Sequence, residues 1–81
     1  MKNVLITGAT GFVGSNLVEE LSKKRYVRLR CILKNDEVYS FSSKNIDIMG
    51  GSLENSLFLE KATKGINIVI HLAAVINSKK I

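Results

Sequence analysis

The sequence of 81 residues lacks several features that mark particular classes of protein. No apolar run approaches the roughly 20 residues that a membrane-spanning helix needs, so we expect no membrane segment. The first residues, MKNVLITGATG, are too few and too rich in glycine for a secretory signal peptide. The single cysteine, Cys31, cannot form an internal disulfide and is typical of a reducing compartment. Together these absences predict a cytoplasmic protein.

Length and charge narrow the possibilities further. The chain suffices for one small domain, and its 46% hydrophobic and 23% charged residues are typical of a soluble globular protein. The net charge of +5 raises the possibility of a nucleic-acid partner. However, the basic residues are scattered, and their densest group, residues 23–25, has no interleaved aromatic residue that could stack on bases. We therefore expect no nucleic-acid partner.

Strand-like and helix-like segments alternate along the chain. Apolar segments predict strands at residues 3–7, 27–33, 46–49 and 67–72, and the last is nearly all apolar, as in a central strand covered on both faces. Apolar periodicity predicts helices at residues 12–24, with Val13, Leu17, Val18 and Leu21 on the buried side, and at residues 56–64. Asn55 is suited to cap the second helix and Gly65 to end it. Strands joined by helical crossovers lie parallel, with right-handed connections. We predict an α/β fold, half of a Rossmann doubly wound parallel sheet, with elements β-α-β-β-α-β and strand order 3-2-1-4.

Three glycines spaced three apart occupy the turn between the first strand and the first helix. Gly8 permits a tight turn, Gly11 lets a pyrophosphate approach the backbone, and Gly14 lets the helix pack closely on the strand. The N–H groups of Gly11, Phe12 and Val13 are expected to face phosphate oxygens, assisted by the helix dipole. The pattern GxxxxGK[ST] is absent, which excludes a P-loop. A tight turn without a ligand is the plainer alternative.

Two side chains that often carry chemistry have structural interpretations here. His71 lies inside a buried-strand pattern without an acidic or cysteine partner at ligand spacing, so we expect a structural role. Cys31 is expected to be a small core residue. We assign no metal-binding residue.

Three segments follow one another at the ends of predicted strands: TGATGFVG at residues 7–14, GGSLEN at residues 50–55 and VIHLAA at residues 69–74. In this combination the sequence resembles the extended short-chain dehydrogenase/reductase superfamily, including nucleotide-sugar epimerases and dehydratases, dihydroflavonol-reductase-like enzymes and atypical relatives. The resemblance covers the whole chain but only the N-terminal part of such an enzyme. It implies that residues 1–81 are the N-terminal part of an NAD(P)-binding Rossmann domain, without the substrate-binding region.

The resemblance implies a set of cofactor-binding residues. Ser52 and Leu53 stand where the family usually has Asp-Leu beside the adenine, and a serine offers no carboxylate to the adenine amino group. Phe12 and Val13 match residues that donate backbone amides to the pyrophosphate. Ala73 and Ala74 match small residues that let the backbone pass the ribose and phosphates of the cofactor. The full set comprises Gly8, Gly11, Phe12, Val13, Gly14, Ser52, Leu53, Ala73 and Ala74, together with Lys34, which is considered next.

The end of the second strand bears on the choice between NAD and NADP. An acidic residue about 20 positions beyond the glycines binds the ribose 2′-hydroxyl of NAD. Counting from Gly14 leads to Lys34, with Asp36 two positions later. Because a lysine tolerates a 2′-phosphate, we favour NADP, whereas an inward-turned Asp36 would favour NAD.

The family's catalytic pair, Tyr-x-x-x-Lys on one helix, has no counterpart in the sequence. Tyr26 is followed four positions later by Arg30, and Tyr39 by Ser43. We therefore assign no catalytic residue and expect no catalysis by this chain alone. The chain is either the NAD(P)-binding portion of an oxidoreductase, epimerase or dehydratase, or a non-catalytic nucleotide-binding module or sensor. Its end soon after the fourth strand favours the former.

The strand predicted at residues 67–72 also suggests self-association. At the edge of a four-stranded sheet it would be apolar on both faces, with no proline, lysine or glutamate to discourage pairing. We predict a homodimer in which two such strands pair antiparallel about a two-fold axis. The alternatives are that the following residues fold over this edge, or that the chain aggregates.

Overall fold

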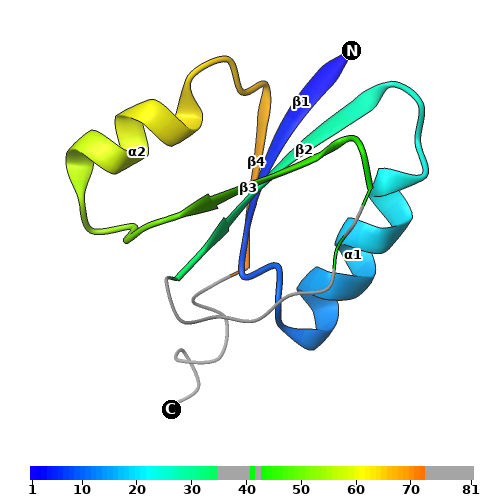
Figure 1. The fold of residues 1–81 in the computed structure, drawn as a ribbon, viewed down its shortest axis with the longest axis horizontal. Helices are drawn as coiled ribbons and strands as arrows, with labels where there is room; N and C mark the ends of the chain where they lie inside the picture. Colours follow the sequence, from blue (N-terminus) through cyan, green and yellow to red (C-terminus); the bar gives the residue numbers. More distant parts are fainter. Residues whose placement is uncertain (35–40, 42, 73–81) are drawn as a thin grey trace.

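The computed structural model describes residues 1–34, 41 and 43–72 (Figure 1). The elements are β1 (Lys2–Thr7), α1 (Phe12–Ser22), β2 (Val27–Leu33), β3 (Ile46–Gly50), α2 (Ser56–Thr63) and β4 (Ile68–His71). The four strands form one parallel sheet of order β3-β2-β1-β4. The fold class and strand order predicted from the sequence are confirmed, and no element end differs from the prediction by more than two residues.

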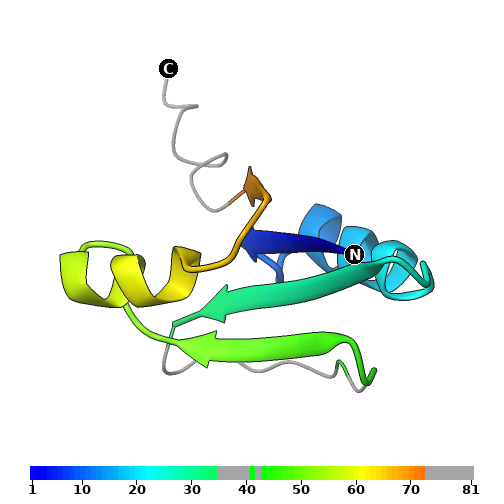
Figure 2. The ribbon, with the colours of Figure 1, turned by 90° about the horizontal axis from the view of Figure 1, so that it is seen from above.

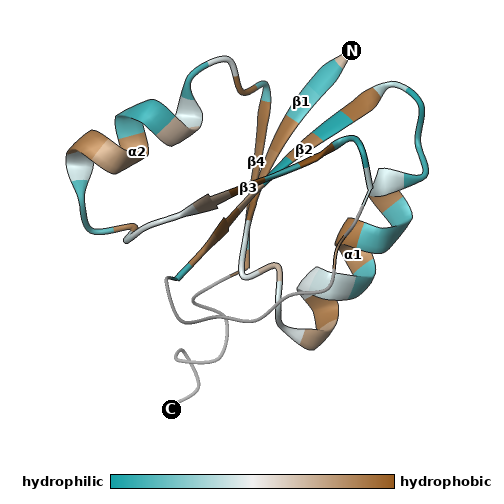
Figure 3. Cartoon of the chain, viewed as in Figure 1, coloured by the Kyte–Doolittle hydropathy of each residue, from teal (hydrophilic) through white to brown (hydrophobic). Residues whose placement is uncertain are grey.

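The two helices lie on opposite sides of the sheet (Figures 1 and 2). Because successive strand side chains point to opposite faces, β1 and β2 contribute to both sides of the core. The larger cluster packs against α1 and comprises Val4, Ile6, Ala9, Val18, Leu29, Cys31 and Leu33. The smaller cluster, on the α2 side, comprises Leu5, Ile32 and Ala62. Figure 3 shows apolar residues concentrated along the strands, with polar residues along much of both helices.

The predicted ends of α2 are confirmed. The side chain of Asn55 accepts a hydrogen bond from the Phe58 amide at 3.0 Å, so it caps the N-terminus. Gly65 has a φ of +78°, the left-handed conformation in which glycine commonly ends a helix.

Two asparagines fasten the beginning of β4 to the beginning of β1. The Asn67 amide donates to the Asn3 carbonyl at 2.8 Å, and the Asn67 side-chain oxygen accepts from the Asn3 amide at 2.8 Å. The Asn3 side chain also donates to the Gly65 carbonyl at 3.1 Å. These hydrogen bonds set the register in which Val4 pairs with Ile68. Sequence reasoning did not identify them, because the partners lie more than 60 residues apart.

Two burial predictions are wrong. Val13 was predicted on the buried side of the first helix but is 65% exposed, because α1 meets the sheet through Leu17, Val18 and Leu21 further along. The strand β4 was predicted to be an apolar strand with covered faces, yet Ile68 and Val69 are 45% and 55% exposed. Among the described residues β4 pairs only with β1 and forms one edge of the sheet. Neither α1 nor α2, the helices of the described part, has the length and apolar character needed to cross a membrane.

Candidate functional site

The turn between β1 and α1 depends on Gly8. Its φ of +77° lies in the left-handed region, which glycine adopts without the strain that a Cβ would cause. Its carbonyl oxygen accepts a hydrogen bond from the Gly11 amide at 3.2 Å and thereby closes the turn. Figure 1 shows this turn at the end of β1, where the chain leaves the sheet to begin α1.

The other two glycines of the turn have opposite steric environments. A Cβ on buried Gly14 would overlap the Gly8 carbonyl oxygen and lie 2.9 Å from the Ala9 Cα, so no side chain fits there. A Cβ on Gly11 would meet only the Gly8 oxygen, at an ordinary 3.6 Å, and Gly11 is exposed. Space at Gly14 is thus closed by the protein itself, whereas the surface at Gly11 is open.

The N-terminus of α1 is suited to an anion. Gly11 is the N-cap and provides no side-chain hydrogen bond, and the first turn contains no acidic residue. The first helical hydrogen bond runs from the Ser15 amide to the Gly11 carbonyl, so the amides of Phe12 and Val13 precede any intrahelical acceptor. The helix dipole favours negative charge at this end. The prediction that Gly11 also offers a free amide is wrong, because that amide donates to Gly8.

Three further predicted residues follow β2 and β3. Lys34 directly follows β2 and is exposed. Exposed Ser52 follows β3, and its hydroxyl accepts from the Glu54 amide at 3.1 Å, while half-buried Leu53 packs against the smaller core cluster. Because the strands are parallel, these positions share the carboxyl edge of the sheet with the glycine turn, where such sheets bind ligands. Ala73, Ala74 and the alternative residue Asp36 lie outside the described residues.

A hydrogen bond joins β1 and β4 at this same edge. The Thr7 Oγ1 lies 2.6 Å from the Nδ1 of His71, and the two residues face each other in the strand register. Thr7 is 4% exposed, whereas His71 is exposed. The expectation that His71 sits in a buried strand is therefore wrong, because β4 lies at the sheet edge. Sequence reasoning did not single out Thr7, although a threonine directly before the first glycine is a usable signal.

Comparison with known proteins bears on this arrangement of glycines and parallel strands. A model of the NAD dependent epimerase/dehydratase family matches residues 4–80. The chain belongs to this family. Its curated relatives include a ceramide reductase of Caulobacter vibrioides, 34% identical over 77 residues, which cover 94% of this chain and 24% of the relative. A decarboxylating sterol-4-alpha-carboxylate 3-dehydrogenase of Dictyostelium discoideum is 37% identical over 79 residues, 91% of this chain and 23% of the relative.

Two more comparisons support membership of this family. An epimerase family protein of Staphylococcus aureus is 35% identical over 80 residues, which cover 99% of this chain and 25% of that protein. A Rossmann-fold NAD(P)-binding family protein from Shigella flexneri superposes with a TM-score of 0.80 at 27% identity, covering 89% of this chain and 37% of that chain. The chain thus spans about a quarter of the length of these curated relatives.

The glycine turn of this epimerase/dehydratase family chain fits a nicotinamide dinucleotide. The test is steric: Gly11 leaves the backbone open to a pyrophosphate, and the uncapped start of α1 presents amides to it. A nicotinamide dinucleotide is the cofactor that the family uses.

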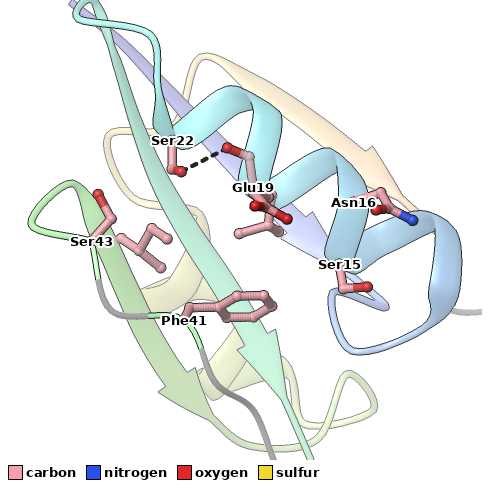
Figure 4. A pocket seen from close by; sticks show the side chains of 8 residues that line it. Ser15, Asn16, Glu19, Ser22, Phe41 and Ser43 are labelled. Atoms are coloured by element: carbon pink, nitrogen blue, oxygen red, sulfur yellow. Dashed lines mark hydrogen bonds between the residues drawn. The ribbon is translucent and has the colours of Figure 1, made fainter.

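A hollow of about 470 Å³ lies along α1, from Ser15 and Asn16 directly after the glycine turn to Ser22, and is lined on its other side by Phe41, Ser43 and Ile46 (Figure 4). Phe41 directs its ring toward α1 and packs against the larger core cluster. The polar side chains on the helical wall form hydrogen bonds within α1 itself. The Ser22 hydroxyl donates to the Glu19 carbonyl, and the side-chain Nδ2 of Asn16 donates to the Phe12 carbonyl, both at 2.8 Å. We assign no chemistry to this hollow.

The remaining side chains that could carry chemistry are not arranged for it. Cys31 is fully buried in β2, and burial raises the pKa of its thiol to about 11, so the thiolate form is disfavoured. Tyr26, exposed before β2, and Arg30, within β2, do not share a helix. Within residues 1–34, 41 and 43–72 no group of three or more His, Cys, Asp or Glu side chains is arranged to hold a metal ion.

Proposed function

We propose that this chain is the N-terminal, NAD(P)-binding portion of an NAD(P)-dependent oxidoreductase, epimerase or dehydratase of the extended short-chain dehydrogenase type. The observation that carries the proposal is the contrast within the glycine turn. Gly14 is closed by the Gly8 carbonyl, while Gly11 and the uncapped start of α1 remain open. A turn needed only for packing would not require an open, amide-lined surface at Gly11.

In this proposal the chain's own residues bind and orient the adenylate half of the dinucleotide. The Phe12 and Val13 amides donate to pyrophosphate oxygens, Gly8 and Gly14 hold the turn in shape, and Gly11 admits the phosphate. Leu53 supports the adenine side, where Ser52 replaces the usual carboxylate, and the family motif assigns Ala73 and Ala74 to the ribose and phosphates. When bound, the nicotinamide supplies hydride exchange.

The reaction itself belongs to a longer protein in this proposal. Residues 1–81 would be the N-terminal part of its nucleotide-binding domain, with the substrate-binding region elsewhere. The relatives named as a reductase and a dehydrogenase support an oxidoreductase parent over a non-catalytic nucleotide module. The substrates in those names, a ceramide and a sterol carboxylate, are candidates for the parent's substrate class only.

For the cofactor we propose NADP ahead of NAD. Lys34 directly follows β2, at the position where NAD-binding chains carry an acidic residue. An ammonium group attracts a ribose 2′-phosphate, whereas a carboxylate repels it. Asp36 remains the residue through which NAD would be selected instead.

We further propose that two copies of this chain pair through β4 and that the protein is cytoplasmic. Among the described residues, the edge of β4 that faces away from β1 has no strand partner, and β4 carries Ile68 and Val69, both substantially exposed, and no charged residue. The unpaired, buried Cys31 supports a reducing compartment.

Calorimetric titration of the chain with ADP-ribose and with nicotinamide mononucleotide tests the main proposal. We expect weak binding of ADP-ribose and weaker binding of the mononucleotide, because the described residues match only the adenylate half of the site. In Gly11→Val the side chain would fill the phosphate space, so binding should fall at least tenfold while the circular dichroism spectrum is retained.

Ser56→Val, which adds a valine at the exposed start of the other helix, is the matched control and should bind like the wild type. Undiminished binding by folded Gly11→Val would contradict a phosphate at this turn. Equal affinity for the two nucleotides would contradict the half-site, and no binding of either would contradict the proposed function.

A further inference from the structure

The hydrogen bond between Thr7 and His71 has an unusual setting. Thr7 is the one buried polar residue among those that the structure describes. Its hydroxyl, which needs a partner when removed from water, has the imidazole of His71 at 2.6 Å. The partner is exposed and adds little to the core, which consists of apolar clusters on the two faces of the sheet. The contact therefore contributes more to the orientation of Thr7 than to packing.

Thr7 occupies the last position of β1, directly before the glycine turn. The next residue is Gly8, whose carbonyl accepts from the Gly11 amide and limits the space at Gly14. The orientation of the peptide after Thr7 thus decides where the start of α1 lies relative to the sheet. A shift of this peptide would move the amides of the helix N-terminus together with it.

His71 has the corresponding position on β4. It is the last residue of that strand, and the backbone ladder continues beyond it through the Leu72 amide, which donates to the Thr7 carbonyl at 3.1 Å. Thr7 is therefore held from β4 both through its backbone, as in the bond to its carbonyl, and through its side chain. Only the second depends on the identity of a side chain.

We propose that His71 is a positioning residue for nucleotide binding: through Thr7 it holds the Gly8–Gly11 turn in the shape that accepts a dinucleotide pyrophosphate. This inference rests on the proposed function. Either neutral tautomer of the imidazole keeps the contact, because the Thr7 hydroxyl can donate to Nδ1 or accept from it. Removing the hydrogen bond therefore requires a substitution.

Two pairs of variants isolate the hydrogen bond. Thr7→Val and His71→Phe remove it while keeping much of the shape, whereas Thr7→Ser and His71→Asn keep a hydrogen-bonding group at nearly the same place. Each variant is titrated with ADP-ribose by calorimetry, and its free energy of unfolding is measured by urea denaturation. The double variant Thr7→Val/His71→Phe completes a thermodynamic cycle.

We expect Thr7→Val and His71→Phe each to weaken ADP-ribose binding about five- to tenfold, the value of one neutral hydrogen bond. Thr7→Ser and His71→Asn should stay within about twofold of the wild type. The double variant should bind no more weakly than the weaker single variant. Because His71 is exposed, His71→Phe should fold even if Thr7→Val does not.

Affinity unchanged in folded His71→Phe, with only its free energy of unfolding lowered, would overturn the inference and leave a purely structural hydrogen bond. Failure of His71→Asn to restore affinity would overturn it as well. If the wild type itself binds no ADP-ribose, the proposed function is overturned, and this inference with it. If the wild type binds ADP-ribose and His71→Phe binds it equally well, the inference about His71 is overturned but the proposed function is not.

Discussion

The guanidinium of Arg30 donates a hydrogen bond to the Ala62 carbonyl at 2.6 Å, so β2 holds the C-terminal end of α2. The same Nη1 donates to the Lys64 carbonyl at 3.1 Å. The last carbonyls of a helix lack intrahelical donors, and a cation there also interacts favourably with the helix dipole. Arg28 lies on the same face of β2 and is exposed, whereas Arg30 is half-buried beside α2.

Arg30→Met should lower the free energy of unfolding by about 1.5–3 kcal/mol, because two charge-assisted hydrogen bonds are lost from a partly buried site. Arg28→Met makes the same chemical change at an exposed position of β2 and should stay within about 0.5 kcal/mol of the wild type. Urea denaturation measures both. Equal effects of the two substitutions would show that Arg30 does not stabilise α2.

Gly14→Ala should destabilise the fold by about 1–3 kcal/mol, since the added Cβ collides with the Gly8 carbonyl and the backbone must move. Intrinsic helix propensity alone would instead predict a gain of up to about 1 kcal/mol, so a loss reports the collision directly. Gly11→Ala, whose Cβ makes only an ordinary 3.6 Å contact with the Gly8 oxygen, is the control and should cost less than about 1 kcal/mol. Thermal or urea unfolding distinguishes them, and a stabilised Gly14→Ala variant would refute the close packing.

Lys34→Ala should reduce the preference for 2′-phospho-ADP-ribose over ADP-ribose about two- to fivefold, the range of one exposed ion pair. Lys44→Ala removes the same charge before β3, at the opposite edge of the sheet, and should leave the preference unchanged. Calorimetric titration at low and high salt measures the preference, which added salt should weaken. A wild type that prefers ADP-ribose would overturn the NADP proposal and direct attention to Asp36.

The thiol of Cys31 makes stability depend on pH at the alkaline end. Burial raises its pKa from 9.0 to about 11, so the unfolded chain releases the proton first. The contribution of the buried thiol is fully present below pH 9 and is lost as pH rises to about 11, a loss of about 2–3 kcal/mol relative to Cys31→Ala. Urea denaturation across this range, compared between the two proteins, measures the difference. Parallel pH profiles would contradict it.

The wild type should form a dimer in concentrated solution through β4, the edge strand of the described sheet, and Val69→Lys should be monomeric, since a lysine on an edge strand discourages pairing. Leu57→Lys places the same charge at an exposed apolar site on α2 and should remain dimeric. Multi-angle light scattering determines the masses. A wild type that stays monomeric, or aggregates without a defined size, would refute the dimer.

The close agreement on fold follows from local signals that do not depend on distant residues. The side chain of Asn55 caps α2 and the backbone of Gly65 ends it, so both ends of α2 could be predicted from the sequence. The glycine spacing likewise predicted the turn after β1. The exposure of individual side chains was harder to predict, because Val13 and Ile68 are apolar and their burial depends on which other elements pack against them.

The amino-acid sequence by itself determined the order of strands and helices, the parallel sheet and the place of the glycine turn. Hydrophobic period, caps and crossover handedness act within a segment or between neighbours in the chain. Only the tertiary structure decided that Arg30 holds α2 and that Thr7 meets His71. The contacts of Arg30 and Thr7 join residues 32 and 64 positions apart, and whether such polar side chains meet depends on the packing of the whole sheet.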